Sequence, residues 1–141
     1  MRNMVRFIEN VSKSDVFHGH HYDAGENSML IRIQDPATEF GRIKHNFKEV
    51  YEFEFLDAED EDGFEDECKI SDDQAKEIIS LLQRAIDNRM NVVVHCHAGI
   101  CRSGAVVEVA TMMGFTPADR YRQPNLRVKR KLMQVLGLTY E

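Results

Sequence analysis

A cysteine and an arginine six positions apart are the residues of this sequence with the clearest chemistry. Cys96 and Arg102 enclose a short loop that contains Gly99 and follows the apolar run 92–94. A strand, a loop and a helix in that order would direct backbone N–H groups and the positive end of the helix dipole toward one point. Arg102 offers a planar fork of donors for two phosphate oxygens, and the same surroundings favour the thiolate of Cys96. The pattern predicts a phosphate-binding loop that carries a sulfur nucleophile.

The segment from His95 to Ser103 has the form His-Cys-x5-Arg-Ser. It resembles the signature of the protein tyrosine phosphatase superfamily, in particular its compact dual-specificity branch. The resemblance implies that Cys96 attacks phosphorus, that Arg102 holds the phosphate oxygens, that Ser103 assists the departure of the sulfur, and that His95 orders the loop and favours the thiolate. The resemblance also implies that the backbone amides from His97 to Ser103 hold the phosphate oxygens together with the Arg102 side chain. These amides include those of His97, Ala98, Gly99, Ile100 and Cys101. The family uses no metal, and we expect no cofactor.

The leaving oxygen of a phosphomonoester needs a proton, so an acid must lie over the phosphate. The resemblance places this acid on a loop ahead of the cysteine, after a strand. Alternating aromatic and acidic residues at 50–55 predict such a strand. Asp57 follows it and is the expected general acid, while Asp60 and Asp62 stay open as alternatives. We expect most of the acidic run 57–67 to be a solvated loop.

Neither the acidic run nor the histidines predict a metal site. An EF-hand loop with its glycine at Gly63 would begin at Ala58 and end at Lys69, and neither of these side chains supplies the oxygen ligand required there. The histidines within 18–21 follow no standard zinc-ligand spacing.

Cys101 lies directly before Arg102, a feature that resembles the low-molecular-weight tyrosine phosphatases. The resemblance implies a reversible Cys96–Cys101 disulfide that protects the nucleophile from over-oxidation. The alternative, a small loop residue without a redox role, stays open. Three cysteines are too few for a disulfide framework, which favours a reducing, cytoplasmic setting.

Length and composition predict one soluble domain spanning residues 1–141. No apolar run is long enough to span a membrane, and none near the N-terminus has the form of a signal peptide. The net charge of −6 makes the chain a poor candidate for nucleic-acid binding. Six basic residues at 120–131 either draw an acidic substrate to the site or form a solvated helix face.

The elements that must position the loop alternate between strands and helices. Strands are predicted at 29–33, 50–55 and 92–94, and helices at about 72–88, at 102–114, from 117 onward and at 126–137. Ser71 and Gln74 form a capping box, and Thr116 followed by Pro117 is typical of an N-cap with proline at the first helical position. The order predicts a three-layer α/β fold with a central, mostly parallel sheet flanked by helices, as in the dual-specificity phosphatases.

Two other functions stay open. A rhodanese-type sulfurtransferase also places a cysteine at the head of an anion-binding loop, but its loop usually lacks the His-Cys-x5-Arg-Ser pattern. A pseudophosphatase binds phosphorylated partners without turnover, but it usually lacks the cysteine or the arginine. The expected substrate is a phosphorylated protein or another phosphomonoester. The sequence does not choose among phosphotyrosine, phosphoserine or phosphothreonine, a phosphoinositide and an RNA 5′ phosphate.

Overall fold

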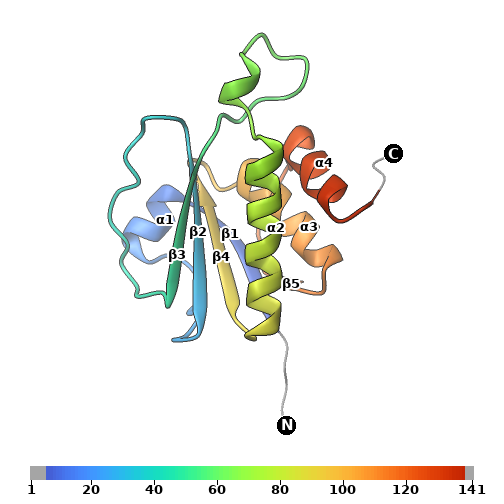
Figure 1. Cartoon of the computed structure of the whole chain (residues 1–141). Helices are drawn as coiled ribbons and strands as arrows, with labels where there is room; N and C mark the ends of the chain where they lie inside the picture. The colour runs from blue at the N-terminus through green and yellow to red at the C-terminus, as the bar shows by residue number, and fades with distance from the viewer. Residues whose placement is uncertain (1–5, 139–141) are drawn as a thin grey trace.

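The computed structural model describes residues 6–138, which form a parallel five-stranded sheet between two layers that contain helices (Figure 1). The strands are β1 (Phe7–Ser12), β2 (Ser28–Gln34), β3 (Glu49–Glu54), β4 (Asn91–Cys96) and β5 (Thr116–Pro117), in the order β3-β2-β4-β1-β5. The helices are α1 (Lys13–His18), the 3-10 helix η1 (Asp66–Cys68), α2 (Asp72–Asp87), α3 (Arg102–Met112) and α4 (Leu126–Val135). The predicted α/β class is confirmed.

Strand β4 lies at the centre of the sheet and is covered on both faces. It pairs in parallel with β2 on one side and with β1 on the other. Val92 and Val94 belong to the main core, with residues of α2, α3 and α4, whereas Val93 packs in a smaller core with Val16 of α1. Burial on both faces explains why this strand is apolar throughout its middle. Because β4 ends at Cys96, the sulfur lies at the carboxyl edge of the sheet, where open α/β sheets place their ligands.

The ends of two helices are fixed by the side chains that the sequence indicates. At the start of α2, Ser71 Oγ accepts from the N–H of Gln74, and the side chain of Gln74 accepts from the N–H of Ser71, both at 3.0 Å. At the start of α4, Asn125 Oδ1 accepts from the N–H of Val128 at 2.9 Å. The predicted helices at 72–88, 102–114 and 126–137 are confirmed, with ends that differ by one or two residues.

Residues 116–117 correct one prediction, because they form the edge strand β5 and do not begin a helix. Thr116 lies beside Phe7 and Pro117 beside Ile8 in parallel register. The N–H of Thr116 donates to the carbonyl of Arg6 at 2.9 Å. Proline has no N–H to donate, and an edge strand tolerates it where a central strand would not.

Strand β1 and helix α1 do not follow from the sequence patterns above. Two buried polar residues, Glu9 and Asn10, interrupt the apolar residues of β1. Asn10 Nδ2 donates to the carbonyl of Gly99 at 2.8 Å and to that of Tyr121 at 3.0 Å. These polar side chains are buried because they join distant segments, and no local pattern records such a role.

None of the described helices is long and apolar enough to cross a membrane. Residues 1–5, where we expect no signal peptide, and residues 139–141 lie outside the described part of the chain. That residues 1–141 form one domain stays a prediction.

Candidate active site

Cys96 ends β4, and the residues 97–101, called the cysteine loop below, turn over its sulfur before α3 begins at Arg102. The N–H of Gly99 donates to Cys96 Sγ at 3.3 Å, and Ser103 Oγ lies 3.2 Å from the same sulfur. Cys96 is only 2% exposed. The structure therefore brings the sulfur, one loop amide and the Ser103 hydroxyl to one place.

Gly99 lets the cysteine loop press against the end of β1. Its φ is +76°, a conformation that favours glycine. A Cβ at this position would lie 2.3 Å from the carbonyl carbon of Val11 and 2.4 Å from the nitrogen of Ser12. Because the backbones approach so closely, any side chain at residue 99 would push the loop away from β1.

Arg102 reaches back from the first turn of α3 over the ends of two strands. Its Nη1 donates to Asp35 Oδ1 and to the carbonyl of Phe55, both at 2.8 Å. Its Nε is buried and has no hydrogen-bond partner among the described residues. One side of the guanidinium is thus anchored to protein, and its Nε has hydrogen-bonding capacity that the described chain does not use.

Asp35 is a site residue that the sequence reasoning missed. It follows β2 directly, and β2 pairs with β4, which carries Cys96. The carboxyl ends of neighbouring parallel strands meet at one edge of a sheet. An acidic residue two positions after the predicted strand 29–33 was therefore the signal that could have indicated Asp35.

His95 is buried behind the cysteine loop and is bonded to Arg32 of β2. Arg32 Nε donates to His95 Nε2 at 3.0 Å, so this ring nitrogen is an acceptor and the proton lies on Nδ1. Burial, and then the charge of Arg32, lowers the pKa of His95 to about 4. His95 is therefore neutral at neutral pH, and it can order the loop without adding a positive charge beside Cys96.

Asp57 is exposed on the loop after β3, and its carboxylate faces the cysteine loop. Asn125 Nδ2 donates to Asp57 Oδ1 at 2.7 Å, and the thiol of Cys101 bonds to the same carboxylate. Asp57, Cys101 and Asn125 line one cavity. The predicted acid and the predicted loop are thus brought together by the fold.

The two alternative acids are engaged elsewhere. Asp60 forms ion pairs with Arg127, at 2.7 Å, and with a second arginine of α4. The hydrogen bond from Arg127 is the main cause of a pKa of Asp60 below its ordinary value. Asp62 accepts a backbone hydrogen bond within its own loop at 2.7 Å. Of the three candidate acids, Asp57 is the one that shares a cavity with a residue of the cysteine loop, and its role as the general acid stays a prediction.

Cys101 contacts Asp57, and the pKa of its thiol is raised. Burial, and then the charge of Asp57 and its hydrogen bond, raise the pKa of Cys101 to about 11. At neutral pH Cys101 is a protonated thiol, and a thiol attacks sulfur far more slowly than a thiolate does. All three cysteines of the chain are free in this structure.

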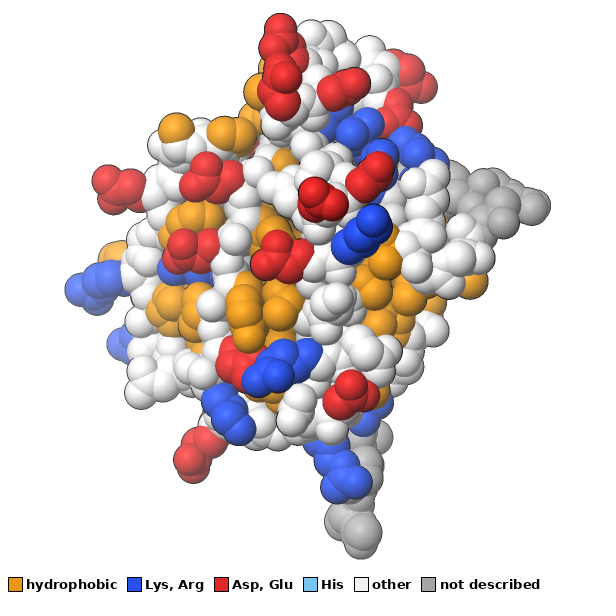
Figure 2. Space-filling model, viewed as in Figure 1, with side chains coloured by type: hydrophobic (Ala, Val, Ile, Leu, Met, Phe, Trp, Pro, Cys, Tyr) orange, Lys and Arg blue, Asp and Glu red, His pale blue; other side chains and the backbone are white. Residues whose placement is uncertain are grey.

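The basic residues at 120–131 are paired with acids of the same chain. The pairs are Arg120 with Glu9 and Asp15, Arg122 and Lys129 with Glu108, Arg127 and Arg130 with Asp60, and Lys131 with Asp72. In Figure 2 acidic side chains gather at the upper tip, with Lys and Arg side chains just below them. This pairing weakens the interpretation that the segment draws an acidic substrate.

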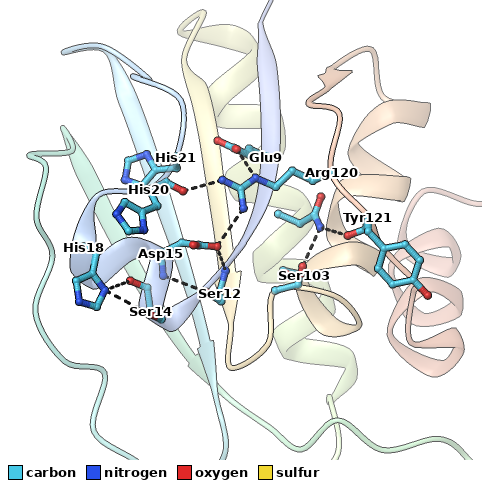
Figure 3. Close-up of polar contacts among 12 residues, drawn as sticks. Glu9, Ser12, Ser14, Asp15, His18, His20, His21, Ser103, Arg120 and Tyr121 are labelled. Carbon is cyan, nitrogen blue, oxygen red and sulfur yellow. Dashed lines mark hydrogen bonds and ion pairs between the residues drawn. The ribbon is translucent and has the colours of Figure 1, made fainter.

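Arg120 also stiffens the junction between β1 and α1. Its guanidinium donates to Glu9 Oε2 at 2.6 Å, to Asp15 Oδ2 at 3.0 Å and to the carbonyl of His20 at 2.7 Å (Figure 3). Glu9 is buried, so this partner compensates a charge that would otherwise be costly. The cysteine loop packs against this junction.

Within residues 6–138, no three His, Cys, Asp or Glu side chains are grouped so that they could hold a metal ion. This holds for the histidines within 18–21 as well.

Residues 62–114 match a family model described as "Tc-R-P: Polymorphic toxin system, DSP-PTPase phosphatase". The matched stretch contains α2, β4, the cysteine loop and α3, and it begins after Asp57. No curated protein matches the chain. The match supports a relationship to the dual-specificity phosphatases and a phosphatase-like function.

Proposed function

We propose that the chain is a cysteine-dependent phosphatase that hydrolyses phosphomonoesters, with phosphorylated protein as the expected substrate. The main support for this proposal is the arrangement around Cys96 Sγ, with the Gly99 amide nitrogen at 3.3 Å and the Ser103 hydroxyl oxygen at 3.2 Å. Arg102 adds a buried Nε without a partner in the described chain. A nucleophile, an oxygen-binding donor set and a fold of the expected class therefore occur together.

In the first step, the thiolate of Cys96 attacks phosphorus. An S–P bond forms and the P–O bond to the leaving group breaks, while Asp57 donates its proton to the leaving oxygen. The Arg102 guanidinium and the loop amides stabilise the charge on the three remaining oxygens.

In the second step, water attacks the cysteinyl-phosphate. Asp57, now a carboxylate, takes a proton from the water, and inorganic phosphate leaves as the S–P bond breaks. The Ser103 hydroxyl, 3.2 Å from Cys96 Sγ, donates a hydrogen bond to the departing thiolate. The route requires no metal ion and no organic cofactor.

Turnover of p-nitrophenyl phosphate tests the proposal directly. We expect the protein to release phosphate and the Cys96→Ser variant to release none, because serine is a far weaker nucleophile in this setting. The same preparations are assayed with thiosulfate and cyanide for sulfurtransferase activity. Sulfur transfer without phosphate release would favour the rhodanese alternative, and binding of phosphate without any turnover would favour a pseudophosphatase.

We also propose a reducing, cytoplasmic setting, in which Cys96 stays reduced. A Cys96–Cys101 disulfide that forms under oxidant is a separate proposal. The contact of Cys101 with Asp57 supports the alternative, in which Cys101 has no redox role. Peroxide inactivation should be reversed by thiols much less well in Cys101→Ser if the disulfide forms. Equal recovery in the two proteins would rule the disulfide out.

A further inference from the structure

A cavity of about 360 Å³ lies beside the cysteine loop. Its lining includes Lys13, Phe17 and His18 from α1, Phe40 and Arg42 from the segment after β2, and His97 from the cysteine loop. His97 directly follows Cys96 in the chain. A group bound in this cavity would therefore be a near neighbour of the phosphate that Cys96 attacks.

Both walls of the cavity are fastened to the candidate active site. The N–H of Lys13 donates to the carbonyl of His97 at 3.2 Å, and Lys13 Nζ donates to the carbonyl of Glu39 at 2.6 Å. Arg32, the partner of His95, donates through Nη2 to the carbonyl of Phe40 at 2.6 Å. These bonds hold α1 and the segment 35–48 at fixed positions beside the loop.

Aromatic rings form much of the lining. Phe17 is 42% exposed, and the guanidinium of Arg42 lies 5.2 Å from the centre of its ring. Phe40 also lines the cavity, and the guanidinium of Arg32 lies 5.4 Å from the centre of its ring. Such rings provide apolar surface on which the aliphatic part of a side chain can pack.

The cations of the cavity have no acidic partner. The lining contains no Asp or Glu. Lys13 and Arg42 form no ion pair with a carboxylate in the part of the chain that the structure describes, in contrast to the paired basic residues at 120–131. Ser14 and His18, which both line the cavity, lie on the side of α1 away from Arg120 (Figure 3). Two unpaired cations in one hollow produce positive potential, even though the net charge of the chain is −6.

We propose that this cavity, the Phe17–Arg42 subsite, binds an acidic side chain next to the phosphorylated residue of a peptide substrate. The inference rests on the proposed phosphatase function. The two methylene groups of a Glu side chain would pack on Phe17, and its carboxylate would reach Arg42 or Lys13. The proposed substrate is a phosphorylated protein, which presents neighbouring side chains to a cavity that shares His97 with the cysteine loop. We therefore favour an acidic phosphopeptide over a lipid headgroup or a nucleotide.

Two phosphotyrosine peptides test the subsite, one with Glu on both sides of the phosphorylated residue and one with Gln there. We expect kcat/KM to favour the acidic peptide by about fivefold, a ratio that one or two ion pairs at a solvent-exposed rim would produce. In Arg42→Gln the ratio should fall toward one. Arg89→Gln, which removes a charge at the other end of the sheet, should keep the ratio.

The outcomes separate the subsite from the proposed function. If p-nitrophenyl phosphate is not hydrolysed, the proposed function fails. If it is hydrolysed but the two peptides are turned over equally, the subsite is wrong. The subsite is also wrong if Arg42→Gln keeps the preference or if Arg89→Gln loses it equally. Hydrolysis of a phosphoinositide in vesicles that depends on Arg42, without a peptide preference, would overturn the choice of a peptide.

Discussion

The guanidinium of Arg102 is held in place by hydrogen bonds to other residues of the protein. Its Nη1 is held by the carboxylate of Asp35 and the carbonyl of Phe55, each at 2.8 Å. Arg102 is 4% exposed, so its guanidinium has little room to adopt other orientations. Asp35, whose side chain is 53% exposed, is the part of this anchor that a substitution can remove.

We predict that Asp35→Ala lowers kcat for p-nitrophenyl phosphate roughly tenfold, because a misplaced donor stabilises the transferring phosphoryl group less well. Asp35→Asn keeps an oxygen acceptor for Nη1 and should recover most of the rate. Steady-state kinetics of the three proteins provide the measurement. A kcat of Asp35→Ala equal to that of the unchanged protein would show that Asp35 does not position Arg102.

His95 makes the folded state sensitive to acid. Its pKa is about 4 in the folded chain, against an ordinary value near 6.5, so below pH 6.5 the unfolded chain binds more protons than the folded chain. Stability should therefore fall as the pH decreases from 6.5 toward 4. From pH 7 to pH 5, His95 should account for a loss of about 2 kcal/mol.

Urea unfolding of the His95→Asn variant at pH 7 and at pH 5 tests this prediction. The free energy of unfolding of the variant should change less between the two pH values than that of the unchanged protein. An identical change in the two proteins would mean that His95 is not held neutral.

Asp57 should be the acid on which the leaving group depends. In Asp57→Asn, kcat should fall about a hundredfold for phenyl phosphate and much less for p-nitrophenyl phosphate, whose leaving group needs little protonation. The decline of kcat toward high pH, which a general acid produces, should disappear as well. Asp60→Asn and Asp62→Asn serve as matched controls. An unchanged pH–rate profile in Asp57→Asn would refute the assignment.

At the scale of elements, α4 and the acid-bearing loop form one unit. Asn125 caps α4 through Oδ1, and its Nδ2 donates to Asp57 Oδ1 at 2.7 Å and to the carbonyl of Ala58 at 3.1 Å. The carboxylate of Glu59 accepts the N–H groups of Leu126 and Arg127, both at 2.9 Å. The start of a helix distant in sequence thereby fixes the position of the proposed acid.

Two substitutions of Asn125 separate these roles. Asn125→Ala should lower the free energy of unfolding by about 1 kcal/mol, because the cap of α4 is lost. Asn125→Ser keeps a capping oxygen and should retain most of this stability. Both variants lose the amide that holds Asp57, so both should hydrolyse phenyl phosphate more slowly. If Asn125→Ser kept the full rate, Asn125 would be a helix cap alone.

At the scale of the whole molecule, the sequence predicts those parts whose signal is local. The apolar run before Cys96 predicts β4, and Ser71 with Gln74 predicts the start of α2. Glu9 and Asn10 interrupt the apolar pattern of β1, so the sequence does not predict this strand. Their buried polar groups bond to segments far along the chain.

The same reason explains the residues that the sequence did not indicate. Asp35 joins the candidate site only when β2 pairs with β4. The Phe17–Arg42 subsite forms only when the fold brings α1 and the segment 35–48 to His97. Thr116-Pro117 is locally compatible with a helix start or an edge strand. Pairing with β1 decides for the strand.

The proposed mechanism depends on a covalent bond between phosphorus and Cys96, and trapping that bond tests the mechanism directly. The protein is mixed with p-nitrophenyl phosphate, quenched within the first turnover by denaturation at alkaline pH, where the S–P bond is stable, and analysed by peptide mass spectrometry. We predict one added phosphoryl group on the peptide that contains Cys96, and none on that peptide from Cys96→Ser. Steady hydrolysis with no phosphoryl group on Cys96, or with the group on another residue, would contradict the mechanism.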